Sequence, residues 1–303
     1  MSLFIFGHKS PDTDSICSAI SLAYLKKQLG IDAKAYALEK PRKEANFVLD
    51  YFKVDTPEIL QPGVIKGQNI CLVDHNEAAQ TADEITEANL IEIIDHHKIG
   101  SLSTDLPISV RIMPVGCTCT IIYNLYKENN VEIPYEIAGL LLSAILSDTL
   151  IFKSPTTTEL DKQAALTLAE IAKVDYEKYG MEMFKAGTSL EGFSIEQIVN
   201  MDFKEFNISN KKVGIGQVMT LDIDSVLSKK EQFLAYINST EFDILILAVT
   251  DIINEGSYLI YKGEDKVISE AFDVDATQGI FVEGIVSRKK QLVPKLTDAV
   301  KNI

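Results

Sequence analysis

The sequence has few cysteines, and none of them forms a recognisable metal or redox motif. The four are Cys17, Cys71, Cys117 and Cys119, and no two of them make a C-x-x-C pair. Only one residue separates Cys117 from Cys119, which is too close for an ordinary disulfide bond. Because thiols stay reduced in the cytosol, this usage predicts four free, mostly buried thiols in a cytoplasmic protein.

Long apolar runs and a basic leader are also missing. No uninterrupted apolar stretch reaches the roughly 20 residues of a membrane-spanning helix, so we expect no membrane partner. Residues 1–7 carry no positive charge ahead of a long apolar core, and they favour a strand over a signal peptide. We find no internal repeat and no low-complexity tract.

Basic residues are in deficit. The chain has 29 lysines and arginines against 44 acidic residues, which gives a net charge of −15. Proteins that bind nucleic acid hold its phosphates with net basic surfaces, so this balance argues against a nucleic-acid partner. It does not exclude a small anionic substrate, because bound metal ions and a few lysines reverse the field locally.

Length and periodicity predict two domains. The chain has 303 residues and 46 % hydrophobic content, enough for two cores. In the first part, apolar runs alternate with helical spacing, which predicts a Rossmann-like parallel sheet of α/β class. Strands are expected at 3–6, 31–38, 67–73 and 90–94, and helices at 16–30, 41–52, 116–129, 134–146, 158–173 and 176–186.

A segment rich in glycine, serine and threonine, 187–194, is the best linker candidate. After it the pattern changes to longer strands, which predicts a smaller mixed-sheet α/β C-terminal domain. Strands are expected at 202–208, 212–221, 243–251 and 257–262, and helices at 229–240 and 293–301. We therefore expect domains at 1–187 and 195–303, with a hinge linker at 188–194.

Histidine is scarce, and its placement is informative. The only four are His8, His75, His96 and His97, each near an aspartate at the end of an apolar run. Because parallel strands direct ligands to the edge at their carboxyl ends, we expect these clusters to converge. With the aspartate that closes the apolar helix at 134–146, the candidates are His8, Asp12, Asp14, Asp74, His75, Asp95, His96, His97 and Asp148.

Aspartates and imidazoles together suit Mn²⁺, Co²⁺, Fe²⁺ or Zn²⁺, and the lack of thiolates in the set favours Mn²⁺. So many carboxylates would repel one another without cations. Two metal ions sharing an aspartate, about 3.5–4 Å apart, would relieve this repulsion. Such a pair lowers the pKa of a bound water and stabilises in-line attack on phosphorus.

In the second domain, three consecutive cations, Arg288, Lys289 and Lys290, are suited to gripping phosphate. Simpler interpretations stay open for single motifs. Residues 12–15 could only cap a helix, Asp148 could be an unliganded loop residue, and the three cations could form a solvated turn. Residues 116–120 could start a helix or bind phosphate.

Five segments together resemble a known family. They are Gly7–Ser15, Val73–Glu77, Asp95–His97, Ser147–Thr149 and Ser287–Gln291. The first four resemble the DHH phosphoesterase superfamily, and the last resembles its manganese-dependent (family II) inorganic pyrophosphatases. Nucleases of the superfamily tend to carry a histidine-containing, glycine-rich motif in the second domain, and no histidine follows His97 here.

The resemblance implies a role for each matching residue. His8 and Asp12 would hold one metal, and Asp14, His96 and Asp148 the other, with Asp74 bridging the two. His97, Lys204, Arg288 and Lys289 would bind the substrate. His75 and Asp95 would orient ligands, and Lys290 could be a bystander.

The implied reaction is hydrolysis of magnesium-complexed pyrophosphate by a hydroxide bridging two Mn²⁺ or Co²⁺ ions. The active site would lie in the cleft between a DHH domain and a DHHA2-like domain of a homodimer. Two alternatives stay open: a DHH-type nuclease or nucleoside-phosphate phosphatase, and a non-catalytic phosphate sensor. The net acidity and the basic segment at 288–290 argue against the first, and the complete ligand set argues against the second.

Overall fold

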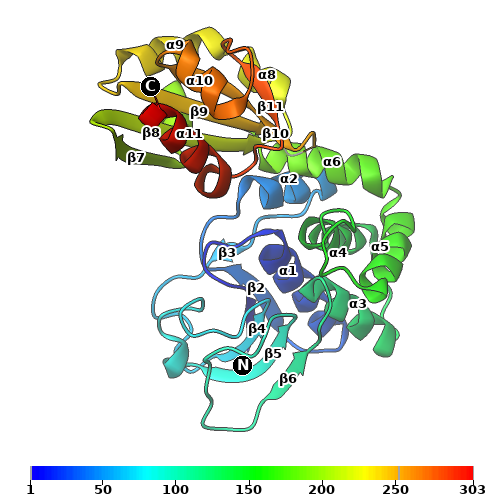
Figure 1. Ribbon diagram of the computed structural model, residues 1–303. Helices are drawn as coiled ribbons and strands as arrows, with labels where there is room; N and C mark the ends of the chain where they lie inside the picture. Colours follow the sequence, from blue (N-terminus) through cyan, green and yellow to red (C-terminus); the bar gives the residue numbers. More distant parts are fainter. Residues whose placement is uncertain (1, 252, 303) are drawn as a thin grey trace. The chain divides into compact units, whose positions relative to one another are not determined.

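The computed structural model describes residues 2–251 and 253–302 of the chain. The chain divides into two compact units, Met1–Gly187 and Thr188–Ile303, and each has its own sheet and core (Figure 1). The first unit combines a parallel sheet with helices, and the second has a mixed sheet. The predicted α/β class is confirmed for both units.

The sheet of the first unit has six strands, in the order β3-β2-β1-β4-β5-β6, and their pairings are parallel. The strands are β1 (Leu3–Phe6), β2 (Ala33–Ala37), β3 (Glu58–Ile59), β4 (Asn69–Val73), β5 (Asn89–Asp95) and β6 (Ser109–Ile112). The chain builds outward from β1 to β3, then returns to the other side of β1 with β4. Strand order therefore reverses between β1 and β4, the position where open parallel sheets bind ligands.

The two edge strands escape the sequence pattern for a physical reason. Strand β3 has only two residues, both exposed, and none of the four residues of β6 is fully buried. An edge strand buries little apolar surface, so neither strand produces the apolar run by which buried strands are recognised.

Helices cover one face of this sheet. They are α1 (Thr13–Gln28), α2 (Lys43–Phe52), α3 (Thr118–Glu128), α4 (Tyr135–Asp148), α5 (Glu159–Ala172) and α6 (Tyr176–Gly187). The two faces of the sheet contribute to different cores, as strand β4 shows. Cys71 and Val73 pack in the core formed with the helices, while Ile70 and Leu72 pack in a smaller core under irregular segments. The helix predicted to be buried is confirmed, since α4 is buried from Ile137 to Leu146.

The second unit has five strands in the order β11-β10-β9-β8-β7, with only β8 and β9 parallel. The strands are β7 (Phe203–Ile208), β8 (Lys211–Thr220), β9 (Ile244–Asp251), β10 (Gly256–Lys262) and β11 (Ile280–Glu283). The helices are α7 (Ile195–Asn200), α8 (Ile223–Leu227), α9 (Lys230–Ser239), α10 (Asp265–Phe272) and α11 (Val293–Asn302). The predicted mixed sheet is confirmed; the sequence pattern does not reveal α7, α8 and α10, which are eight residues or shorter.

Strand β9 separates two cores in this unit. Ile244, Ile246 and Ala248 pack in one apolar cluster, while the alternate residues Leu245 and Leu247 pack in the other. Successive side chains of a strand point to opposite faces, so an unbroken apolar run fits a strand with helices on both sides.

The segment after α6 packs with the second unit. Leu190 lies in one of that unit's apolar clusters, and the Thr188 hydroxyl oxygen accepts a hydrogen bond from the Leu221 N–H at 3.2 Å. All four cysteines are free and buried, as predicted. Within the described ranges, no helix combines the length and apolar character needed to cross a membrane.

Candidate metal centre

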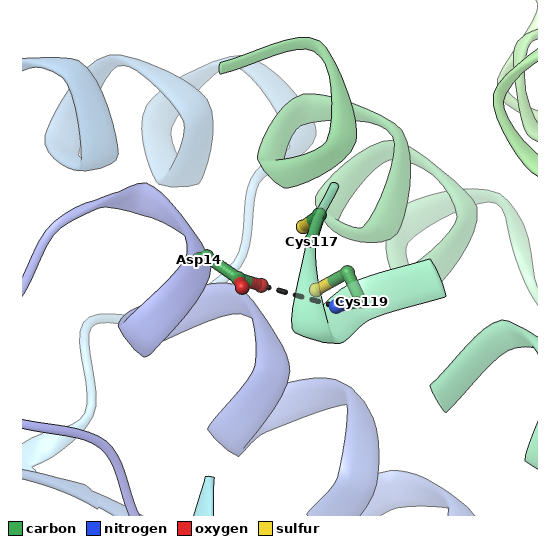
Figure 2. Close-up of side chains that lie close together, drawn as sticks. All are labelled: Asp14, Cys117 and Cys119. Atoms are coloured by element: carbon green, nitrogen blue, oxygen red, sulfur yellow. Dashed lines mark hydrogen bonds between the residues drawn. The ribbon is translucent and has the colours of Figure 1, made fainter. Parts of the chain in front are cut away.

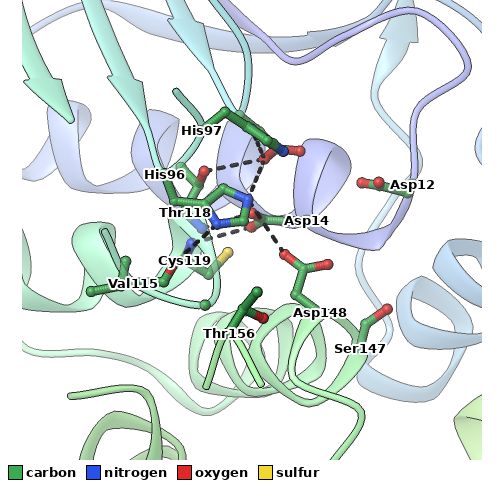
Figure 3. Close-up of polar contacts among 12 residues, drawn as sticks. Asp12, Asp14, His96, His97, Val115, Thr118, Cys119, Ser147, Asp148 and Thr156 are labelled. Atoms are coloured by element: carbon green, nitrogen blue, oxygen red, sulfur yellow. Dashed lines mark hydrogen bonds and ion pairs between the residues drawn. The ribbon is translucent and has the colours of Figure 1, made fainter. Parts of the chain in front are cut away.

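The structure brings together side chains from five segments of the first unit. His8 follows β1, Asp74 follows β4, and His96 and His97 follow β5. The start of α1 and the end of α4 add three aspartates (Figure 3). All of these side chains except that of Asp14 line a cleft of about 630 Å³, whose walls are His8, Lys9, Asp12, Arg42, Asp74, Gln80, His96, His97, Val115, Gly116, Asp148 and Thr156.

Asp74 is the central carboxylate of this cluster. Its Oδ2 lies 3.4 Å from His8 Nε2, and its Oδ1 lies 3.5 Å from His96 Nε2. The side chain is only 2 % exposed. The backbone of Asp74 adopts a left-handed conformation, φ 62°, which costs a non-glycine residue about 1–3 kcal/mol. This strained turn directs the carboxylate from the end of β4 between the two imidazoles.

Two histidines are fixed through their second ring nitrogen. His8 Nδ1 donates to the Lys9 carbonyl oxygen at 2.7 Å, and His96 Nδ1 donates to the Val115 carbonyl oxygen at 3.1 Å. A carbonyl oxygen only accepts, so Nδ1 must carry a proton in both rings. In the neutral tautomer, Nε2 then offers its lone pair towards the carboxylates, as metal-binding histidines do.

Asp12 and Asp14 are held at the start of α1 by different partners. Asp12 is the N-cap of α1, with Oδ1 accepting from the Ser15 N–H at 3.0 Å and Oδ2 3.4 Å from His8 Nε2. The capping interpretation is therefore correct for Asp12, and the same carboxylate also faces the cluster. Asp14 is buried, and its two oxygens accept from the N–H groups of Thr118 (2.7 Å) and Cys119 (3.1 Å).

Helix α3 begins at Thr118 with Cys117 as its N-cap, so the prediction that residues 116–120 start a helix is confirmed. Besides its N–H contact with Asp14, Thr118 donates from its hydroxyl to Asp74 Oδ1 at 3.2 Å. Sequence reasoning misses this role. N–H groups in the first turn of a helix have no partner within the helix, so a buried carboxylate is a favourable acceptor for them.

The pKa values of several side chains in the cluster are raised, so the cluster favours bound protons or other positive charge. Burial and the neighbouring charge of Asp74 raise the pKa of Asp14 to about 7, and burial and Asp14 raise the pKa of Asp148 well above its ordinary range. Burial alone would lower the pKa of His8, but the carboxylates of Asp12 and Asp74 outweigh it and raise the pKa to about 11. Burial opposes charge on His96 too, yet hydrogen bonding to Asp74 and the charge of Asp14 raise its pKa to about 9.

These residues fit divalent cations. The ligand atoms of His8, Asp12 and Asp74 lie within 4.8 Å of one another, as do those of Asp14, His96 and Asp148. Both groups combine carboxylate oxygens with one imidazole, donors that suit manganese. Cations would replace the protons that now balance the carboxylates, and metal binding would release those protons.

His97 differs from His96 in its surroundings. It is 53 % exposed, and its Nδ1 donates to Asp95 Oδ1 at 2.9 Å. That hydrogen bond is the main cause that raises the pKa of His97. Asp95 is fully buried and also accepts from Asn76 Nδ2 at 2.5 Å, so Asn76 and Asp95 together fix the His97 ring. Sequence reasoning does not single out Asn76.

His75 lies behind the cluster. It is fully buried, and its Nδ1 donates to the Val73 carbonyl oxygen at 2.9 Å. Its ring meets that of His8 edge to face, with centroids 6.3 Å apart. His75 therefore supports His8 by packing and belongs to none of the ligand groups described above.

Glu44 is a further residue that sequence reasoning misses. Its Oε1 accepts from the Thr13 hydroxyl at 2.6 Å and from the Ser147 hydroxyl at 2.5 Å. Thr13 stands between Asp12 and Asp14, and Ser147 precedes Asp148. One carboxylate oxygen therefore joins the start of α1 to the end of α4.

The expected phosphate-binding cations lie in the second unit. Arg288 begins a short π-helical turn, η2 (Arg288–Leu292), and its Nη1 lies 2.8 Å from Asp202 Oδ1. The Arg288 N–H also donates to Gln217 Oε1 at 3.0 Å. Lys204, on β7, and Lys289 are both exposed. Within this unit, the ion pair therefore joins the turn at Arg288 to the residue before β7, and Asp202 offsets the charge of Arg288.

Comparison with known proteins identifies both parts of the chain. Residues 2–145 match the DHH family, N-terminal domain, and residues 181–299 match the DHHA2 domain. The chain is 47 % identical over 305 residues to a "Probable manganese-dependent inorganic pyrophosphatase" of Clostridium acetobutylicum, covering 99 % of this chain and 98 % of the relative. It is 44 % identical over 304 residues to the "Manganese-dependent inorganic pyrophosphatase" of Bacillus subtilis, covering 98 % of each.

Solved structures agree with these relatives. A Methanococcus jannaschii protein described as a family II inorganic pyrophosphatase matches with a TM-score of 0.63 and 43 % identity, over 99 % of both chains. An exopolyphosphatase-related protein from Bacteroides fragilis has a TM-score of 0.53 at 13 % identity, which supports the fold alone. The five sequence motifs already resembled this family, and the chain therefore belongs to the manganese-dependent inorganic pyrophosphatases.

Proposed function

We propose that this protein hydrolyses inorganic pyrophosphate to two phosphate ions, the reaction for which its family is named. One observation carries the proposal: the two oxygens of Asp74 face different imidazoles, those of His8 and His96. A carboxylate in that position is suited to bridging two cations. Phosphorus–oxygen cleavage by two-metal sites needs such an arrangement.

We assign each ligand to the ion that its nearest ligand atoms would share. His8 and Asp12 would hold one manganese ion, Asp14, His96 and Asp148 would hold the other, and Asp74 would be shared by both. Co²⁺ could replace Mn²⁺ because the same donors suit both ions. When bound, the two cations activate a water molecule and offset the charge that develops on the phosphate oxygens.

The protein's own residues supply orientation, protons and charge. His97, held through Nδ1 by Asp95, donates from its other ring nitrogen to the oxygen that leaves phosphorus. Lys204, Arg288 and Lys289 bind the phosphate groups of a magnesium-complexed substrate. Arginine offers a planar pair of donors, and each lysine offers a compact charge.

The second unit closes on the substrate about residues 188–194. Thr188 and Leu190 pack with the second unit, so we place the pivot at the very start of this segment, where Gly187 joins Thr188. Closure would exclude bulk water and bring Lys204, Arg288 and Lys289 to the cleft. The four free thiols favour a reducing, cytoplasmic compartment, and family membership favours a homodimer.

Phosphate release from several substrates tests this function. Protein preloaded with Mn²⁺ should release phosphate from pyrophosphate at least about 100-fold faster than from nucleoside phosphates or short oligonucleotides. Hydrolysis of oligonucleotides without hydrolysis of pyrophosphate would assign the chain to the nuclease class. Tight phosphate binding with no hydrolysis of any of these substrates would make it a sensor.

Replacing Arg288 by alanine should weaken substrate binding or turnover while leaving bound manganese unchanged. Charged hydrogen bonds contribute about 1.5–3 kcal/mol, so we expect kcat/KM to fall by about 10- to 100-fold. The proposed ligands all lie in the first unit, so metal content should stay at the wild-type value. Lys290→Ala, an adjacent exposed lysine, is the matched control and should have little effect. Wild-type kinetics in the Arg288→Ala protein would show that Arg288 does not bind the substrate phosphates.

Replacing Glu44 by alanine should weaken manganese binding without touching a ligand. Glu44 positions Thr13 and Ser147, so its loss frees the ligands next to both. Loss of such a supporting contact typically costs about 10- to 100-fold in metal affinity. Glu44→Gln keeps a carbonyl oxygen that can accept from both hydroxyls, and it should restore most of the affinity. Equal losses in the two variants, measured by manganese titration, would mean that the hydrogen bonds are not the cause.

A further inference from the structure

Two thiols lie against the cluster on the side of Asp14. The Sγ atoms of Cys117 and Cys119 and a carboxylate oxygen of Asp14 all lie within 4.8 Å of one another (Figure 2). All three side chains are buried. The proposed manganese ligands include Asp14 but no thiol, so the proposed function leaves both thiols unused.

The local backbone explains why both thiols face Asp14. Cys117 is the N-cap of α3 in an extended conformation, φ −157° and ψ 143°, and Cys119 lies in the first turn. The N–H groups of Thr118 and Cys119 bind the two oxygens of Asp14. This clamp holds the carboxylate beside both thiols, and the second lone pair of each oxygen is left for another partner.

Cys117 and Cys119 are fully buried beside the carboxylate of Asp14. A free cysteine thiol is ordinarily neutral at physiological pH. Two neutral thiols are poor ligands for a hard ion such as Mn²⁺, whereas soft cations favour thiolate sulfur strongly enough to displace protons.

We propose that Cys117, Cys119 and Asp14 form a second cation site that takes a thiophilic divalent ion such as Cd²⁺ or Zn²⁺. Binding forms two metal–sulfur bonds and one metal–oxygen bond, and it releases the two thiol protons to solvent. Gly116, the residue before Cys117, lines the 630 Å³ cleft, so Cys117 lies next to the cleft wall. The ion is recognised by two sulfur atoms and one carboxylate.

The site has a consequence that rests on the proposed function. Asp14 belongs to both the thiol site and the proposed manganese centre, so one carboxylate would serve two competing ions. A soft cation at the thiols draws Asp14 away from manganese. We therefore expect Cd²⁺ to displace part of the bound manganese and to inhibit the enzyme, and a dithiol chelator to reverse both effects.

Absorption spectroscopy tests the site independently of pyrophosphate hydrolysis. The full-length protein, with and without bound manganese, is titrated with Cd²⁺ while the ultraviolet thiolate-to-metal charge-transfer band and proton release are recorded. We expect a band that saturates near one Cd²⁺ per chain with release of about two protons. Mn²⁺ should give no such band. A dithiol chelator should abolish it.

Matched cysteine variants locate the site. Cys117→Ser and Cys119→Ser should each lose at least about half of the band and bind Cd²⁺ at least about 10-fold more weakly. Cys119→Ala is a second variant, in case serine perturbs the turn. Cys71→Ser is the control, since Cys71 is a buried thiol on β4 and belongs to no ligand group described here.

Two results would overturn the proposal. One is Cd²⁺ binding without a charge-transfer band, which would place the ion on the carboxylates and imidazoles alone. The other is a band that persists unchanged in both Cys117 and Cys119 variants. Neither result depends on the substrate, so failure of the thiol site is distinguishable from failure of the proposed hydrolysis.

Discussion

Replacing Asp74 by alanine is expected to remove bound manganese and pyrophosphatase activity together. Among the residues that the structure describes, Asp74 is the one carboxylate whose two oxygens face separate imidazoles, at 3.4 Å and 3.5 Å. Its loss would leave each proposed ion without a shared ligand and leave Asp14 and Asp148 to repel each other. Supporting contacts alone are worth about 10- to 100-fold, so a bridging ligand should cost at least about 1,000-fold in kcat/KM, or ~4 kcal/mol.

Asp74→Asn separates charge from shape. Asparagine keeps the size of the side chain and can still accept from the Thr118 hydroxyl, but it lacks the negative charge that both ions share. We expect it to lose metal nearly as fully as the alanine variant. Asp55→Ala, which removes an exposed aspartate of the same unit, is the control and should bind metal as the wild type does.

The test of the bridging role is to measure metal content after gel filtration together with the rate of pyrophosphate hydrolysis. Normal metal content in both Asp74 variants would exclude the bridging role. Lost activity with normal metal content would move Asp74 to a role in substrate binding.

His96→Gln and His97→Gln are expected to fail in different ways. His96 is mostly buried, with Nδ1 committed to Val115 and Nε2 facing Asp74, so its loss should release metal. His97 is half exposed and is held by Asp95, so its loss should spare metal and reduce turnover. General acid catalysis contributes about 100- to 10,000-fold, and we expect kcat of His97→Gln to fall within that range.

The two variants control each other. They remove the same chemical group from adjacent positions, and glutamine can still donate a hydrogen bond in each. Manganese titration and kcat are measured for both. Equal metal loss in the two proteins would show that His97 is itself a ligand, a role that its place among ligand atoms within 4.8 Å of Asp74 and His96 would allow.

Much of the fold follows from local patterns. The apolar runs within 67–73 and 134–146 each identify an element, because a strand or helix that is buried on all sides needs apolar residues at nearly every position. The edge strands β3 and β6 give no such pattern, since they bury little surface. The short helices of the second unit are missed because about two turns contain too few periodic positions.

The sequence likewise predicts part of the candidate site and misses another part. The sequence predicts that the ends of β1, β4 and β5 carry histidines and aspartates, because parallel strands share one functional edge. It does not predict that Glu44 joins Thr13 to Ser147, or that Asn76 supports Asp95. These contacts use common polar residues whose importance depends only on what folding places beside them.

The sequence by itself determines that histidines and aspartates gather at the ends of β1, β4 and β5, since motif spacing and the scarcity of histidine are local facts. Only the tertiary structure decides which atoms face one another. Asp14 meets the N–H of Thr118 across a separation of 104 residues, and Thr118 meets Asp74 across 44. No local pattern encodes such pairs, because they arise when the start of α3 packs against the switch point of the sheet. The same packing places two thiols beside Asp14, a carboxylate of the proposed metal centre.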